Sequence, residues 1–83
     1  MIRLQYFASF RERLGLDAES LPWTPALTSL RAVRDLLAER GEPWASTLGH
    51  SGLMCARNEL LCDLDEPMRD GDDIAFFPPV TGG

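Results

Sequence analysis

The sequence predicts an α+β roll, in which one main helix packs on one face of a β-sheet. Alternating apolar and polar residues indicate strands near both ends of the chain, at residues 2–7 and 73–77. Between them, leucine and valine recur at helical spacing within residues 30–40. A chain of 83 residues has room for one small core. We therefore expect a single domain over residues 1–83, ending in a flexible tail at residues 79–83.

The N-terminal part is expected to form a strand, a short helix and a weaker strand. The first strand covers residues 2–7, and a helix over residues 8–14 can end at Gly15, which suits a C-cap. The weaker strand lies around Glu19–Trp23, where Pro22 indicates the edge or the end of a sheet.

The main helix is expected over roughly residues 30–40. Thr28 or Ser29 can cap its N-terminus and Gly41 can end it. Its apolar stripe consists of Leu30, Val33, Leu36 and Leu37. Pro43 can then begin a further short helical turn.

The C-terminal part returns to strands. Residues 53–57 and 60–62 flank Asn58-Glu59, and asparagine tolerates the positive φ that a two-residue hairpin turn requires, although glutamate is a poor second residue there. The last strand is expected at residues 73–77. Pro78-Pro79 should end its pairing, because proline has no backbone N–H.

In this hairpin register Cys55 lies opposite Cys62, and Ala56 lies opposite Leu61. Two cysteines are too few for a disulfide scaffold, an iron–sulfur cluster or a four-cysteine zinc site. We expect both to be reduced packing residues, close together but not bonded, in a cytoplasmic protein.

Alternation also predicts an apolar surface on the sheet face opposite the helix. The helix should cover Ile2, Leu4, Tyr6, Ile74 and Phe76. The opposite face then carries Phe7, Leu61, Ala75 and Phe77, where a lone antiparallel sheet is normally polar. These residues form a candidate surface for binding a partner. The alternatives are a loop folded over them or a register shifted by one residue.

Charge and composition exclude several classes of function. Thirteen acidic residues against eight basic ones give a net charge of -5, which does not suit a nucleic-acid or anionic-membrane binder. All eight basic residues are arginine. The N-terminal stretch alternates in polarity and so does not resemble a signal peptide, and no run of residues is apolar enough to span a membrane.

No conventional active site is evident. The single histidine, His50, lies in a glycine-flanked loop and is interpreted as a surface residue. The acidic residues after Cys62 do not have the spacing of a calcium-binding loop, and we interpret them as a solvated turn. No metal site and no bound cofactor are expected.

The C-terminal tail is the informative segment. Val80-Thr81-Gly82-Gly83 follows the double proline. Five residues from Pro79 span at most about 17 Å when extended. Because glycine has no side chain, the tip can enter a narrow slot in another protein. The alternative is a frayed terminus without function.

These features resemble the MoaD-type sulfur carriers, the small subunits of molybdopterin synthase, which have a ubiquitin-like β-grasp fold. The resemblance covers the whole chain and is gapped mainly between Asp17 and Ser29. Its marks are Tyr6-Phe7-Ala8, Arg11-Glu12, Gly15, Asn58 and Pro67-Met68-Arg69-Asp70-Gly71-Asp72. The most specific is the ending Ala75-Phe76-Phe77-Pro78-Pro79-Val80-Thr81-Gly82-Gly83. The chain departs from the pattern at Glu59 and at the two cysteines.

The resemblance implies a sulfur carrier that is not an enzyme on its own. An E1-like, MoeB-like adenylyltransferase would use ATP to activate the Gly83 carboxylate, and a persulfide donor would convert it to a thiocarboxylate, a terminal thioglycine. The tail would then enter a MoaE-like large subunit of a heterotetrameric synthase. There the sulfur would attack cyclic pyranopterin monophosphate to build the dithiolene of molybdopterin.

The resemblance also assigns residues. Gly83 bears the sulfur, with Gly82 beside it. Phe7, Leu61 and Phe77 match the family's apolar contact with the large subunit. The tail adds Pro78, Pro79, Val80 and Thr81, and Arg11 contributes a salt bridge at the rim. Met54, Trp23 and Trp44 are interpreted as packing residues.

Alternative functions remain within the same fold. The chain could carry sulfur for thiazole, cysteine or thiolated-tRNA synthesis. It could also be a ubiquitin-like modifier joined to proteins through Gly83, or an interaction module with an inert tail.

Overall fold

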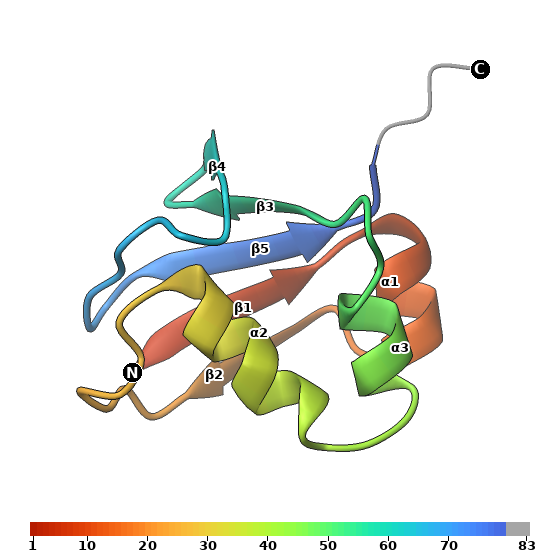
Figure 1. Cartoon of the computed structure of the whole chain (residues 1–83), viewed down its shortest axis with the longest axis horizontal. Helices are drawn as coiled ribbons and strands as arrows, with labels where there is room; N and C mark the ends of the chain where they lie inside the picture. The colour runs from red at the N-terminus through yellow and green to blue at the C-terminus, as the bar shows by residue number, and fades with distance from the viewer. Residues whose placement is uncertain (80–83) are drawn as a thin grey trace.

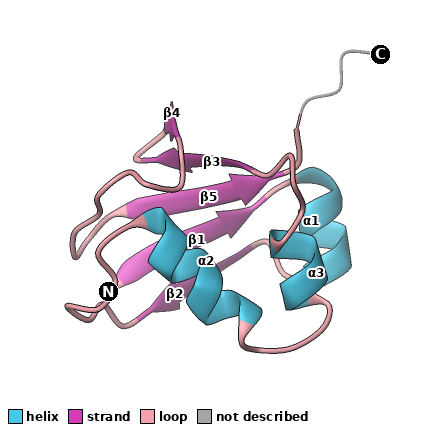
Figure 2. Cartoon of the chain, viewed as in Figure 1, coloured by secondary structure: helices cyan, strands magenta, loops and turns pink. Residues whose placement is uncertain are grey.

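The computed structural model describes residues 1–79. A five-stranded sheet has its helices gathered on one face and at one end (Figures 1 and 2). The elements in chain order are β1 (Ile2–Tyr6), α1 (Ala8–Leu14), β2 (Ala18–Leu21), α2 (Leu30–Ala38), α3 (Trp44–Leu48), β3 (Met54–Arg57), β4 (Leu60–Cys62) and β5 (Asp73–Phe77). The predicted α+β roll is confirmed.

The sheet is mixed, with the strand order β2-β1-β5-β3-β4. The first and last strands, β1 and β5, pair in parallel at its centre, whereas the other neighbours are antiparallel. The β3–β4 register is the predicted one, with Cys55 opposite Cys62 and Ala56 opposite Leu61. β2 is an edge strand that ends before Pro22, as expected of a strand interrupted by proline.

Positive φ values occur at the predicted turns. Gly15 closes α1 at φ 69°, and Gly41 follows α2 at φ 88°. Asn58 and Glu59 have φ 51° and 70°, so both central residues of the hairpin turn are left-handed, as a two-residue type I′ turn requires. Glutamate therefore occupies a position that glycine would fill with less strain.

Helix α2 begins where predicted and ends two residues early. The Ser29 hydroxyl accepts a hydrogen bond from the Ala32 backbone N–H at 3.4 Å, so serine provides the cap. Leu30, Val33 and Leu37 are buried, but the prediction for Leu36 is wrong, because this side chain is 44% exposed. The apolar stripe of this nine-residue helix therefore has three buried side chains, and Leu36 lies at its border.

The core lies between the sheet and the helices. Its strand residues are those predicted for the covered face: Ile2, Leu4, Tyr6, Ile74 and Phe76. Phe10 of α1 and Leu48 of α3 complete it, while Trp23 and Trp44 pack against its border, as predicted. In the described part of the chain, no helix is long and apolar enough to cross a membrane.

A polar cluster ties the β2 edge to the end of α2. The Tyr6 hydroxyl donates to Glu19 Oε2 at 2.8 Å, and the Arg40 guanidinium donates to both Glu19 carboxylate oxygens at 2.9 Å. Burial and this carboxylate together raise the pKa of Tyr6. The same guanidinium lies 4.4 Å from the centre of the Trp44 ring. The cluster therefore closes the core at the edge of the sheet.

Candidate functional site

The sheet face opposite α2 carries a continuous apolar surface, which we call the outer patch. Side chains of directly paired residues lie on the same face, so the strand registers identify its members. The outer patch consists of Phe7, Met54, Ala56, Leu61, Ala75 and Phe77. It therefore contains all four residues that alternation predicted there, and Leu61 is 68% exposed and Phe7 44% exposed. No described segment covers these two side chains.

Phe7 and Phe77 form the aromatic end of the outer patch. The parallel pairing of β1 with β5 extends to a hydrogen bond from the Phe7 N–H to the Phe76 carbonyl at 3.3 Å. This contact brings the two rings edge to face, with centroids 6.4 Å apart. Phe7 is also the N-cap residue of α1, so the start of that helix fixes the position of the Phe7 backbone.

Two members of the outer patch were missed or misassigned from the sequence. Met54 was interpreted as a packing residue, but the register pairs it with Phe77 and so places it on the outer face. Ala56 lies between Leu61 and Ala75, which joins the β4 end of the patch to its centre. The predicted hairpin register already set Ala56 opposite Leu61, and the two-residue period of a strand places Met54 on the same face as Ala56, so the hairpin is the signal that would have found both.

The root of the tail lies at the aromatic end of the outer patch. β5 ends at Phe77, and Pro78 and Pro79 are half-buried. The remaining tail residues predicted to act, Val80, Thr81, Gly82 and Gly83, lie outside the residues that the structure describes. Arg11 is exposed one helical turn after Phe7, and its backbone N–H donates to the Phe7 carbonyl at 3.4 Å.

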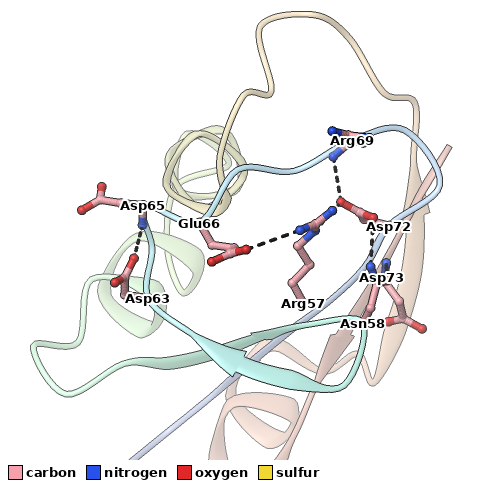
Figure 3. Close-up of polar contacts among 8 residues, drawn as sticks. All are labelled: Arg57, Asn58, Asp63, Asp65, Glu66, Arg69, Asp72 and Asp73. Atoms are coloured by element: carbon pink, nitrogen blue, oxygen red, sulfur yellow. Dashed lines mark hydrogen bonds and ion pairs between the residues drawn. The ribbon is translucent and has the colours of Figure 1, made fainter.

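Behind the β3–β4 hairpin, the Asp72 carboxylate acts as a polar hub (Figure 3). It accepts hydrogen bonds from Arg57 Nε at 2.8 Å, Asn58 Nδ2 at 3.0 Å and the Arg69 N–H at 2.7 Å. Burial alone would raise the pKa of Asp72, but these donors outweigh it and hold the pKa below its usual value. The hub fixes the hairpin that presents Leu61.

The hairpin is also tied directly to β5. The Asp73 N–H donates to Asn58 Oδ1 at 2.9 Å, and the Asn58 N–H donates to the Asp73 carbonyl at 2.7 Å. Arg57 reaches Glu66 at 3.4 Å on its other side (Figure 3). The left-handed turn is therefore held by its asparagine, and Leu61 has a fixed place in the outer patch.

The two cysteines are free thiols, as predicted. The Cys55 thiol donates to the Cys62 carbonyl at 3.3 Å. Burial raises the pKa of Cys55 to about 12, and burial also raises the pKa of Cys62. Because the thiolate is the reactive form, neither thiol is arranged as a nucleophile.

Other candidate groups do not assemble a second site. His50 is exposed, as predicted, and its Nδ1 accepts from the Gly52 N–H at 2.9 Å. An open hollow of about 310 Å³ lies beside the hairpin, and its lining includes Arg57, Leu60 and Glu66. Within residues 1–79, no cluster of three histidine, cysteine, aspartate or glutamate side chains is placed to hold a metal ion.

Solved structures with this arrangement identify its class. The Haloferax volcanii small archaeal modifier protein 1 aligns with a TM-score of 0.73 over 95% of this chain and 97% of its own, at 21% identity. A chain of the complex of subunits 1 and 2 of molybdopterin-converting factor from Helicobacter pylori is 28% identical, with a TM-score of 0.67 over 99% of this chain and 97% of its own. The fold is the ubiquitin-like β-grasp, here with an exposed apolar face at the end of β5.

Sequence comparisons then identify the family. The ThiS family matches residues 4–83. Molybdopterin synthase sulfur carrier subunits from Haemophilus influenzae and Escherichia coli are 42% and 40% identical to the chain, and each alignment covers all of both proteins. The chain belongs to the ThiS family, among the sulfur carrier subunits of molybdopterin synthase.

Proposed function

We propose that this chain carries sulfur as a thiocarboxylate on Gly83 and delivers it to cyclic pyranopterin monophosphate, within molybdopterin synthase, to form the dithiolene of molybdopterin. The outer patch beside the end of β5 is the observation that supports this proposal most. It offers an exposed apolar surface to a partner next to the point where the Gly-Gly tail begins. Membership of the sulfur carrier subunits supports it independently.

The chemistry requires an activating enzyme. An E1-like, MoeB-like adenylyltransferase uses ATP to form an acyl-adenylate on the Gly83 carboxylate, with pyrophosphate as the leaving group. The terminal sulfur of a persulfide donor then displaces AMP and forms an acyl disulfide. A second thiol cleaves the S–S bond of this intermediate, which releases the thiocarboxylate and leaves the two thiol sulfurs joined in a disulfide. Adenylation supplies a good leaving group, and sulfur is a better nucleophile than a carboxylate oxygen. ATP binds to the activating enzyme, and this chain needs no cofactor of its own.

In this proposal the outer patch binds the large subunit, and the tail delivers the sulfur. Phe7, Leu61 and Phe77 dock on the MoaE-like large subunit, where Arg11 adds an ion pair at the rim. The stretch from Pro78 to Thr81 leads the tail into the slot, and Gly82 keeps its tip slim. The acids, bases and phosphate-binding groups belong to the large subunit. The reaction takes place in the cytoplasm, where Cys55 and Cys62 stay reduced.

Intact mass after incubation with the E1-like enzyme, ATP, a persulfide donor and a thiol reductant tests the proposal. The expected product has one oxygen replaced by sulfur, located by fragmentation at Gly83, and the same mixture without ATP gives no change. Attachment of the chain to lysines of other proteins would indicate a modifier. An unchanged mass in the complete mixture would favour an inert tail, and both results would overturn the proposal. If the thiocarboxylate forms but no sulfur is transferred to the pterin in the presence of the large subunit, the chain would serve another sulfur pathway.

A further inference from the structure

The contact between β3 and β5 continues beyond the first residue of β3 and the last residue of β5. The ladder ends at the pair Met54–Phe77. Continued by two residues, the same register sets Gly52 opposite Pro79. Backbone pairing cannot continue there, because Pro78 and Pro79 have no N–H to donate. What holds the root of the tail at this point is therefore packing.

Gly52 lies in close contact with the Pro79 ring. A Cβ atom built on Gly52 would meet Pro79 Cγ at 2.9 Å and His50 Cε1 at 3.3 Å. By contrast, Gly15, Gly41 and Gly71 have positive φ and nothing within 4 Å of such an atom. Gly52 does not have the left-handed conformation that favours glycine at those three positions. The crowding that a Cβ would meet at position 52 comes from neighbouring rings, most closely from Pro79, and not from the backbone conformation.

The loop that carries Gly52 is fixed on its other side. The Gly52 N–H donates to His50 Nδ1 at 2.9 Å, and the Leu53 N–H donates to the His50 carbonyl at 3.1 Å. The His50 ring lies 6.4 Å, centroid to centroid, from Phe10, which is buried in the core. The loop therefore contacts α1 through the His50 ring, and its Gly52 contacts the Pro79 ring at the root of the tail.

We propose that Gly52 is a positioning residue for sulfur transfer, and this inference rests on the proposed function. The loop at residues 50–53 fixes where the Pro79 ring lies relative to the outer patch. When the large subunit docks on that patch, the position of Pro79 sets where the tail enters and how far Gly83 reaches. A side chain at position 52 pushes Pro79 away from the loop and misplaces the reacting sulfur, without altering the docking face.

Sulfur transfer by thiocarboxylated Gly52→Ala, with the carrier as the varied substrate of the large subunit, tests the inference. Misplacement by a fraction of an ångström is expected to lower kcat about tenfold, since about 1 Å can cost about 100-fold. KM and the melting temperature should stay close to those of the wild type. Ser51→Ala, an exposed change in the same loop, is the matched control and should retain the wild-type kcat.

Removing the opposing ring provides the second arm. Pro79→Ala deletes the Cγ atom that a Cβ at position 52 would meet, so adding Gly52→Ala to Pro79→Ala should cost no further kcat. Equal kcat for Gly52→Ala and wild type would overturn the inference. So would a loss of activity that comes from a raised KM or a lowered melting temperature. A loss of kcat that Gly52→Ala still causes on the Pro79→Ala background would overturn it as well. Wild-type protein that transfers no sulfur would instead overturn the proposed function.

The contact itself is tested apart from activity by the nuclear Overhauser effect between the Gly52 α-protons and the Pro79 ring. The absence of this effect would also refute the inference.

Discussion

Phe76 and Phe77 are adjacent in sequence and have opposite roles. Phe76 is fully buried under the helices, whereas Phe77 lies on the outer face with its ring against Phe7. The two-residue period of a strand accounts for the difference, because successive side chains point to opposite faces. One aromatic contributes to folding, and the next is available to a partner.

Alanine substitutions should separate these roles. Phe76→Ala is expected to lower the free energy of unfolding by about 3–5 kcal/mol, because it leaves a cavity in the core. Phe77→Ala should cost little stability but weaken binding to the large subunit by roughly 2 kcal/mol, the usual size for an aromatic at the centre of an interface. Urea unfolding and titration calorimetry measure the two quantities. A Phe77→Ala protein that binds normally and unfolds much more easily would place Phe77 in the core.

At the scale of elements, α2 shows how far periodicity predicts burial. The spacing of Leu30, Val33, Leu36 and Leu37 identified a helix with one apolar face, and three of the four are buried. Periodicity cannot say how wide a stripe the sheet will cover. That width depends on how the helix rests on its neighbours, and here it leaves Leu36 at the border.

The two adjacent leucines give a direct test. Leu37→Ala is expected to lower the free energy of unfolding by about 2–5 kcal/mol, since Leu37 is fully buried. Leu36→Ala should lower it by clearly less, about 1 kcal/mol, because Leu36 is 44% exposed and alanine favours helix. Thermal or urea unfolding of the pair measures this contrast. Similar losses for both would show that the helix is rotated on the sheet.

The polar hub at Asp72 predicts a pH dependence. Its pKa is lowered in the folded state by Arg57, Arg69 and Asn58. A carboxyl with a lowered folded pKa stabilises the fold above its unfolded pKa, and that contribution disappears as the pH falls through the folded pKa. The hub should therefore contribute fully at neutral pH and lose its effect in acid, below about pH 4.

Asp72→Asn isolates this contribution. At pH 7 the variant should be less stable than wild type by about 1–3 kcal/mol, since a neutral amide cannot accept all three hydrogen bonds. The difference should shrink as the pH is lowered, because the wild-type carboxyl becomes protonated. Asp70→Asn is the matched control, as Asp70 lies in the same turn and forms an exposed ion pair with the Met1 amine. A difference that stays constant down to acid pH would argue against the hub (Figure 3).

Local patterns predicted most of the elements but not their long-range pairing. Glycine caps, the Asn58 turn and the alternating strands were all readable, because each depends on a few neighbouring residues. The hairpin register with Leu61 also implied the outward placement of Ala56 and Met54, although it was not drawn from the sequence. The pairing of β3 with β5 was not readable, since it joins distant parts of the chain. The contact between Gly52 and Pro79 depends on the same pairing. The hub at Asp72 likewise joins the β3–β4 hairpin, through the Arg57 and Asn58 side chains, to the loop before β5, where the Arg69 backbone N–H is the third donor.

For the whole molecule, fold and proposed function meet at one end of the sheet. The parallel pairing of β1 with β5 brings the first and the last strand together at the centre of the sheet (Figure 1). Phe7 and Phe77 therefore lie together where β5 ends. The outer patch could be predicted from alternation because it needs only strand period and helix placement. The tail could be assigned only through its sequence, because Gly82 and Gly83 lie outside the described residues.

The central claim is that function resides in the Gly83 terminus. The most direct test compares sulfur transfer to the pterin precursor by the wild type and by a chain lacking Gly83. The assay contains the activating enzyme, a persulfide donor and the large subunit. The deletion shortens the tail by about 3.4 Å and should abolish transfer, while binding to the large subunit and the melting temperature stay near wild type. Normal transfer by the shortened chain would contradict the account.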